Sequence, residues 1–175
     1  LPAFVAGQSV GWSLLFGCEP KFHPDTVWVD PIPVGDDGYP ELRFTPPNPW
    51  WRWYRSGIEK AARASNGRYF IIPEMGNDAG DTLAMVRGSQ NLMLDIAQDP
   101  EWVRAAVKTV SDVIVAAYEE LVALASAEAC GVEGNVNDHG CWWTGRGRGL
   151  NCDVSCMVST RTFEDIFLPP LVETM

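Results

Sequence analysis

The sequence predicts an α/β protein built from parallel β/α units that form part of a closed (β/α)8 (TIM) barrel. Apolar runs bounded by glycine and proline are typical of strands buried on both faces. Segments with helical three- and four-residue periodicity follow these runs. A complete barrel needs about 250 residues, and this chain has 175. We therefore expect residues 1–175 to be a single partial barrel domain, with strands missing at its carboxyl side and before Leu1.

Composition excludes several function classes. The net charge is −10, with 46% hydrophobic and 21% charged residues. A nucleic-acid partner is not expected, because binding phosphates requires clustered Lys and Arg. No run approaches about 18 consecutive apolar residues, so no membrane span is expected. Five cysteines form no paired framework, which favours a reducing compartment and hence the cytoplasm.

The first half of the chain contains two predicted strands and one predicted helix. Residues 26–30 (Thr-Val-Trp-Val-Asp) alternate like a strand. Asn48-Pro49 provides a cap and a first-position proline for a helix that ends at Asn66-Gly67. The Trp50-Trp51-Arg52-Trp53 cluster on this helix favours packing against the barrel wall over an aromatic ligand cage. Residues 68–73 are a continuous apolar run and predict a buried strand.

The second half is predicted to be mostly helical. Short helices are expected near 81–87 and 90–97, and Asp99-Pro100 opens the strongest helix of the chain. One apolar stripe runs along that helix: Val103, Val107, Val110, Ile114, Ala117, Leu121 and Leu124. A long glycine-rich loop, Gly131–Gly149, then leads to a predicted strand over Leu150–Ser155. Ser159 or Thr160 opens a final helix that Pro169-Pro170 is expected to stop.

Polar residues at the ends of predicted strands are the candidate site residues, because parallel barrels carry their sites there. Asp153 is a candidate catalytic residue that would bind pyrrole N–H groups or transfer a proton. Alternatively, it caps the following turn or pairs with an arginine. Glu74 is a second catalytic candidate, and Asn77 and Asp78 are candidate substrate ligands. For most of this acidic segment the alternative is a solvated loop in which Asp78 or Asp81 caps the next helix.

The glycine-rich loop holds the remaining candidates. Arg146 and Arg148, beside Trp142, could bind substrate carboxylates on a loop over the active face. They could equally pair with the surplus acidic residues. His139 and Cys141 have an H-x-C spacing that, with Cys152 or Cys156, could hold zinc. Packing of single cysteines is the favoured alternative, so no metal site is expected from spacing alone.

Three segments in order resemble the uroporphyrinogen decarboxylase superfamily of TIM barrels. They are Gly17–Trp28, Asp81–Val103 and Cys152–Pro169, and the last looks like the family's D-x-S…S-x-x-x-F-x-x-F-x-x-P strand-to-helix unit. The resemblance implies either cofactor-free decarboxylation of uroporphyrinogen III or methyl transfer between a corrinoid carrier and a thiol. In the latter case it also implies zinc, on a motif beyond Met175.

Two positions depart from the decarboxylase pattern. Ala84 stands where those enzymes carry a tyrosine, and Asp153 where they carry a serine. The resemblance with these departures favours a decarboxylase-like paralogue that handles a tetrapyrrole or a corrinoid-bound methyl group. Its partners would be a tetrapyrrole or a corrinoid protein, with corrinoid and zinc as cofactors if it is a methyltransferase. Residues 1–175 are expected to be inactive alone.

A second hypothesis belongs to a different class. An open sheet leaves unpaired strand edges, so the chain could be a non-catalytic module that assembles with a copy of itself or with a missing barrel half.

Overall fold

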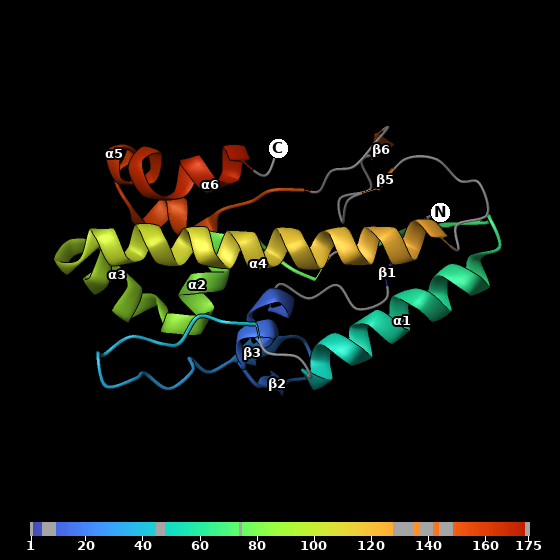
Figure 1. Ribbon diagram of the computed structural model, residues 1–175, viewed down its shortest axis with the longest axis horizontal. Coiled ribbons are helices and arrows are strands. Elements are labelled where there is room, and N and C mark those ends of the chain that lie inside the picture. Colours follow the sequence, from blue (N-terminus) through green and yellow to red (C-terminus); the bar gives the residue numbers. More distant parts are fainter. Residues whose placement is uncertain are drawn as a thin grey trace.

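The computed structural model describes residues 2–4, 10–44, 48–73, 75–127, 135–136, 142–143 and 149–173. Helix α4 (Pro100–Ala127) runs along almost the whole length of the molecule. Helices α1 (Pro49–Ser65), α2 (Ala79–Arg87) and α3 (Ser89–Gln98) all contact it. Figure 1 shows α2 and α3 beside one half of α4 and α1 beside the other.

Short strands and tight helices complete the described part of the chain. Strands β1 (Pro2–Phe4) and β4 (Phe70–Ile72) form a parallel pair. Four further strands and one 3-10 helix lie before or after the long helices: η1 (Gly11–Phe16), β2 (Pro20–Phe22), β3 (Val27–Val29), β5 (Asn135–Val136) and β6 (Trp142–Trp143). The C-terminal elements are η2 (Asp153–Met157), α5 (Thr160–Thr162), the π-helical turn η3 (Phe163–Phe167) and α6 (Leu168–Glu173).

The long helices follow their predicted caps. The Asn48 side chain accepts a hydrogen bond from the Trp51 backbone N–H, and Pro49 takes the first position of α1. Asp99 accepts from the Trp102 N–H at the start of α4. The predicted α4 stripe is buried except at its end, where Leu124 is only partly covered. It packs in one core with η1, α1, α2 and the C-terminal helices.

One of the predicted strands pairs differently from the prediction, and another pairs in parallel as expected. The strand predicted near residues 26–30 forms as β3, but it pairs antiparallel with β2 in a hairpin, with Pro20 opposite Val29. A hairpin forms here because only four residues separate the two strands, and the His23 N–H donates to the Thr26 carbonyl across the turn. The strand predicted over 68–73 forms as β4, in parallel register with β1.

The strand predicted over Leu150–Ser155 is wrong. Residues 149–152 have no regular structure, and Asp153–Met157 form the 3-10 helix η2. A strand would need a neighbour for its N–H groups. Here the Asp153 and Val154 N–H groups donate to the Asp81 carboxylate instead.

The predicted stop at Pro169-Pro170 is also wrong. Ser159 opens the final helix as expected, but the helical path continues through the two prolines to Glu173. The π-helical turn η3 precedes them, so both prolines fall in the first turn of α6. Proline is tolerated there, because first-turn N–H groups have no partner within their own helix.

The described strands form three two-stranded sheets, so the described part of the chain does not by itself form a closed barrel. Membership of a larger barrel therefore stays an expectation from the sequence. None of the described helices is both long and apolar enough to cross a lipid bilayer.

Candidate functional site

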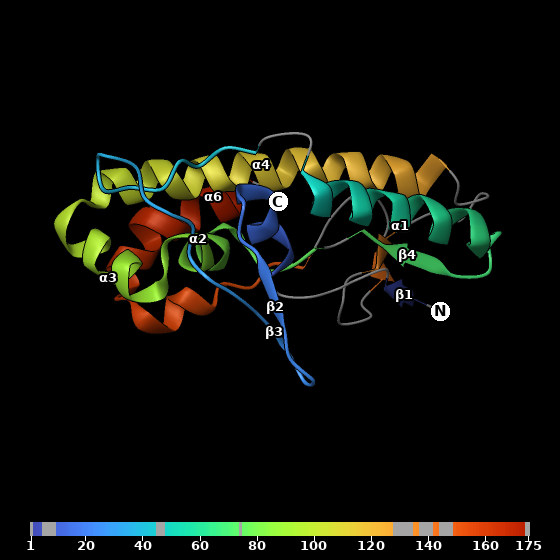
Figure 2. The ribbon, with the colours of Figure 1, turned by 90° about the horizontal axis from the view of Figure 1, so that it is seen from below.

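A groove of about 480 Å3 separates the β2–β3 hairpin from α2 and η2. Figure 2 shows the hairpin extending away from the helices. The walls of the groove are mostly apolar, with Trp28 on the hairpin side and Met85 and Met157 on the helical side. Asn77, Asp81 and Asp153 contribute the carboxylate and amide groups. A concave apolar surface with a few convergent polar groups is typical of a ligand site.

Helix capping positions the polar wall of this groove. The Asp78 side chain caps α2 by accepting the Asp81 backbone N–H at 2.9 Å. Asp81 then lies in the first turn of α2, where its carboxylate accepts three hydrogen bonds. The donors are the Asp153 N–H at 3.0 Å, the Val154 N–H at 2.9 Å and the Asn77 amide at 3.2 Å. Asp81 thus fixes the turn that carries Asp153.

The two aspartates of the groove differ in their surroundings. Asp81 is buried, and this burial raises the pKa of its carboxyl group. Its backbone donors work against the rise, while the charge of Asp153 adds to it. The Asp153 side chain is exposed on the groove wall. Asp153 is therefore accessible to a ligand, whereas Asp81 holds structure together.

Cys152, Asp78 and Asp81 form a cluster whose potential ligand atoms lie within 4.8 Å of one another. Burial raises the pKa of the Cys152 thiol, and the charge of Asp78 and a hydrogen bond with it raise it further. The thiol therefore stays protonated at neutral pH. Both Asp81 oxygens and one Asp78 oxygen already accept N–H groups. The contacts present in this cluster are the Asp78 cap of α2 and the hydrogen bond between Asp78 and the Cys152 thiol.

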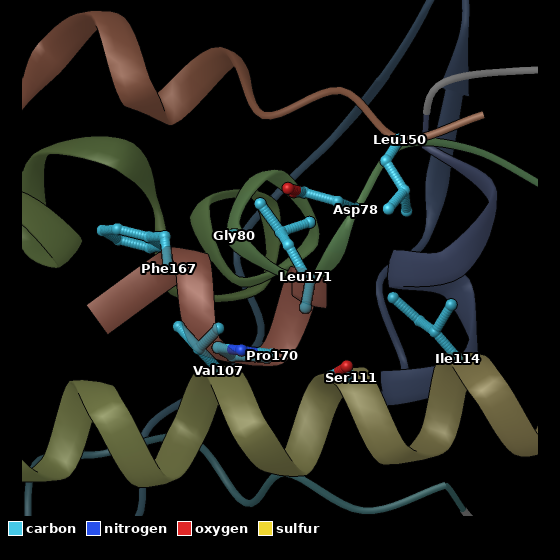
Figure 3. Close-up of a pocket in the computed structure, with 10 residues that line it drawn as sticks. Asp78, Gly80, Val107, Ser111, Ile114, Leu150, Phe167, Pro170 and Leu171 are labelled. Atoms are coloured by element: carbon cyan, nitrogen blue, oxygen red, sulfur yellow. The ribbon is translucent and has the colours of Figure 1, made fainter. Parts of the chain in front are cut away.

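A second cavity lies behind the Asp78 cap, away from the groove. Figure 3 shows it between α4 and the C-terminal helix, with Asp78, Phe167 and Leu171 on its wall. Its volume is about 10 Å3, which is close to the space that one water molecule needs. This cavity is too small for a substrate.

The structure brings together some of the predicted site residues. Asn77 and Asp153 line the groove. Asp78 takes the alternative role of a cap: it is 2% exposed and does not line the groove. Trp142 lies on β6, paired with β5, and is exposed outside the groove. The predicted residues Glu74, His139, Cys141, Arg146 and Arg148 lie outside the described residues.

Sequence reasoning missed the hairpin side of the groove. Trp28 is 62% exposed while its strand neighbours Val27 and Val29 are half-buried. The Val-Trp-Val alternation is the signal that could have placed the tryptophan on the opposite face of the strand from its neighbours. The partner strand β2 (Pro20–Phe22) has no comparable alternation in its sequence. Ala84, named as a departure from the decarboxylase pattern, does line the groove.

No family model, curated protein or solved structure matches this chain.

Proposed function

We propose that the groove binds a tetrapyrrole-type macrocycle, and that the protein is a decarboxylase-like enzyme acting on a corrinoid-bound methyl group. The observation that carries this proposal is the groove itself. Its apolar walls suit a large flat ring, while Asp153 and Asn77 can accept hydrogen bonds from N–H or amide groups at the edge of that ring. A cytoplasmic location is part of the same proposal.

Charge favours a corrinoid over uroporphyrinogen. No lysine or arginine among the described residues lines the groove, and two carboxylates do. The chain as a whole carries a net charge of −10. Uroporphyrinogen bears many carboxylates, which this surface would repel. A corrinoid bears neutral amide side chains. Their NH2 groups can donate hydrogen bonds to a carboxylate such as that of Asp153.

The residue at position 84 also favours a corrinoid over uroporphyrinogen as the ligand. Its methyl group lines the groove where the resembling decarboxylases would place a tyrosine hydroxyl. The alanine methyl group cannot donate a hydrogen bond to a developing negative charge. The groove therefore lacks one hydrogen-bond donor that the decarboxylation implied by the resemblance would use. The exposed carboxylate of Asp153 could take up the proton that an acceptor thiol loses when it is methylated.

The first prediction concerns binding of methylcobalamin. Calorimetric titration should show binding that Asp153→Ala weakens by about tenfold, the loss expected for a charged hydrogen bond of about 1.4 kcal/mol. Ala84→Tyr should weaken it as well, by filling the groove. Asp112→Ala, which removes an exposed carboxylate of α4 away from the groove, is the control. Tighter binding of uroporphyrinogen III, or binding of neither compound, would contradict the proposal.

The parallel pair β1–β4 favours a second candidate function. Parallel strands occur almost only in larger, covered sheets. Among the described residues, the sheet that contains β1 and β4 has only these two strands. A binding module that completes its sheet with a partner chain is the alternative. Sedimentation of the protein separates the two candidates. A concentration-dependent dimer without methylcobalamin binding favours the module, and a monomer that binds methylcobalamin favours the enzyme.

A further inference from the structure

A third cavity, of about 320 Å3, lies where the β2–β3 hairpin meets the start of α1. Four aromatic rings line it: Phe22, Trp50, Trp53 and Tyr54. Below we call this the aromatic cavity. It is distinct from the groove, although Val10 and Val27 contribute to the walls of both.

The rings of the aromatic cavity stand at steep angles to one another. Trp50 and Trp53 are nearly perpendicular, at 81° with their centroids 6.5 Å apart. Phe22 lies 6.4 Å from Trp50 and is tilted by 54°. Rings that only fill a core would be covered, but Trp53 is 58% and Phe22 71% exposed. Such rings present their edges and faces to one shared, open space.

Charge around the aromatic cavity favours a cation. No lysine or arginine among the described residues lines it. The Trp50 indole N–H donates to the Glu19 carboxylate at 3.4 Å, which places a negative charge at the edge of the ring cluster. Lys21, on strand β2 of the hairpin, forms an ion pair with Asp30. The faces of tryptophan rings attract cations through their quadrupole.

We propose that the aromatic cavity binds a quaternary ammonium group of a small molecule. Several rings at steep angles can contact the methyl groups of such a cation from different sides, and Glu19 offsets its charge. A primary ammonium would need hydrogen-bond acceptors, and the walls are mostly apolar. This inference rests on residues outside the groove and is independent of the function proposed for it.

The test compares two ligands of nearly the same shape. Choline carries a trimethylammonium group, and 3,3-dimethylbutan-1-ol carries a neutral tert-butyl group in its place. Calorimetric titration of the protein should show choline binding about tenfold more tightly, because several exposed aromatic faces together attract the cation and lack this attraction for the neutral group. Equal binding of the two compounds, or no binding of choline, would overturn the proposal.

Substitutions in and outside the aromatic cavity test whether choline binds there. Trp53→Ala should reduce choline affinity by about tenfold, and Trp53→Phe, which keeps an aromatic face, by less. Glu19→Gln should reduce it by a smaller factor while leaving the Trp50 contact in place. Trp142→Ala is the matched control, since Trp142 is another tryptophan of similar exposure, 55%, outside the cavity. Choline affinity that Trp53→Ala leaves unchanged would place the site elsewhere. Asp153→Ala should leave choline binding unchanged, which separates this site from the groove.

Discussion

Asp81 and Asp153 are neighbours on one wall of the groove, yet they perform different tasks. Asp81 accepts backbone N–H groups of residues more than 70 positions later in the chain. Asp153 offers an exposed carboxylate on the turn that these bonds fix. The sequence alone could identify Asp153 as a candidate, because it interrupts an apolar run. It could not identify the clamp formed by Asp81, because that role depends on a contact between distant segments.

Replacing Asp81 by Asn should destabilise the protein by about 1–3 kcal/mol, the cost of unsatisfied buried groups. The asparagine NH2 would face N–H donors where a carboxylate oxygen now accepts them. Thermal unfolding measures the loss. Asp153→Asn, which alters an exposed carboxylate, should change stability by less than about 0.5 kcal/mol. Equal effects of the two substitutions would mean that the clamp contributes nothing.

The same variant should alter the pH dependence of stability. The pKa of Asp81 is raised in the folded state above its ordinary value of 3.8. Folding therefore favours the protonated form of the Asp81 carboxyl group. The stability that this preference contributes is fully present below pH 3.8 and is lost as pH rises through the pKa of Asp81 in the folded state. Asp81→Asn should remove this component from a series of unfolding curves, relative to the native chain.

At the scale of elements, local signals succeeded where caps and periodicity act within one segment. The Asn48-Pro49 and Asp99-Pro100 pairs located the starts of α1 and α4. The predicted strand near Asp153 failed because a distant segment decides the structure there: the Asp153 N–H donates to Asp81, 72 positions earlier, which no local window of sequence shows. The predicted stop at Pro169 failed for a local reason, because the π-helical turn directly before it places the prolines in the first turn of α6.

The corner between α2 and α3 illustrates such a contact between elements. Arg87 at the end of α2 donates to both oxygens of Asp95 on α3, at 2.6 and 3.1 Å, and both side chains are largely buried. The guanidinium also lies 5.5 Å from the Tyr39 ring and 5.9 Å from the Trp102 ring. These two rings stack at 4.2 Å, which joins the segment around Tyr39 to α4.

Arg87→Met should therefore destabilise the protein by about 3–5 kcal/mol, because it leaves the Asp95 carboxylate buried without its partner. Arg87→Lys should recover only part of the loss, since lysine cannot form the two-pronged contact. Urea unfolding provides the measurement. The control is Lys108→Met, which removes an exposed pair with Asp112 within α4 and should change stability by less than about 1 kcal/mol. A similar loss in both variants would contradict the role given to burial.

At the scale of the whole molecule, α4 joins two groups of elements. It contacts α1 in one half, and α2, α3 and α6 in the other. The apolar stripe along α4 predicted a buried face, but not which elements would cover it. A barrel would cover such a helix with strands, whereas the described residues cover it largely with helices. The barrel expectation came from the resemblance and from element order, and neither specifies the partners of one helix.

Because α4 belongs to both groups, a cavity near its middle should affect the entire molecule. Ile114 is 1% exposed and belongs to the common core, so Ile114→Ala should cost about 2–5 kcal/mol. Helical circular dichroism and tryptophan fluorescence should shift together in one transition, since Trp12 packs in the same core. Val115→Ala alters the next residue of α4, which is 36% exposed, and should shift neither signal much. Two separate transitions would show instead that the halves unfold independently and that α4 does not couple them.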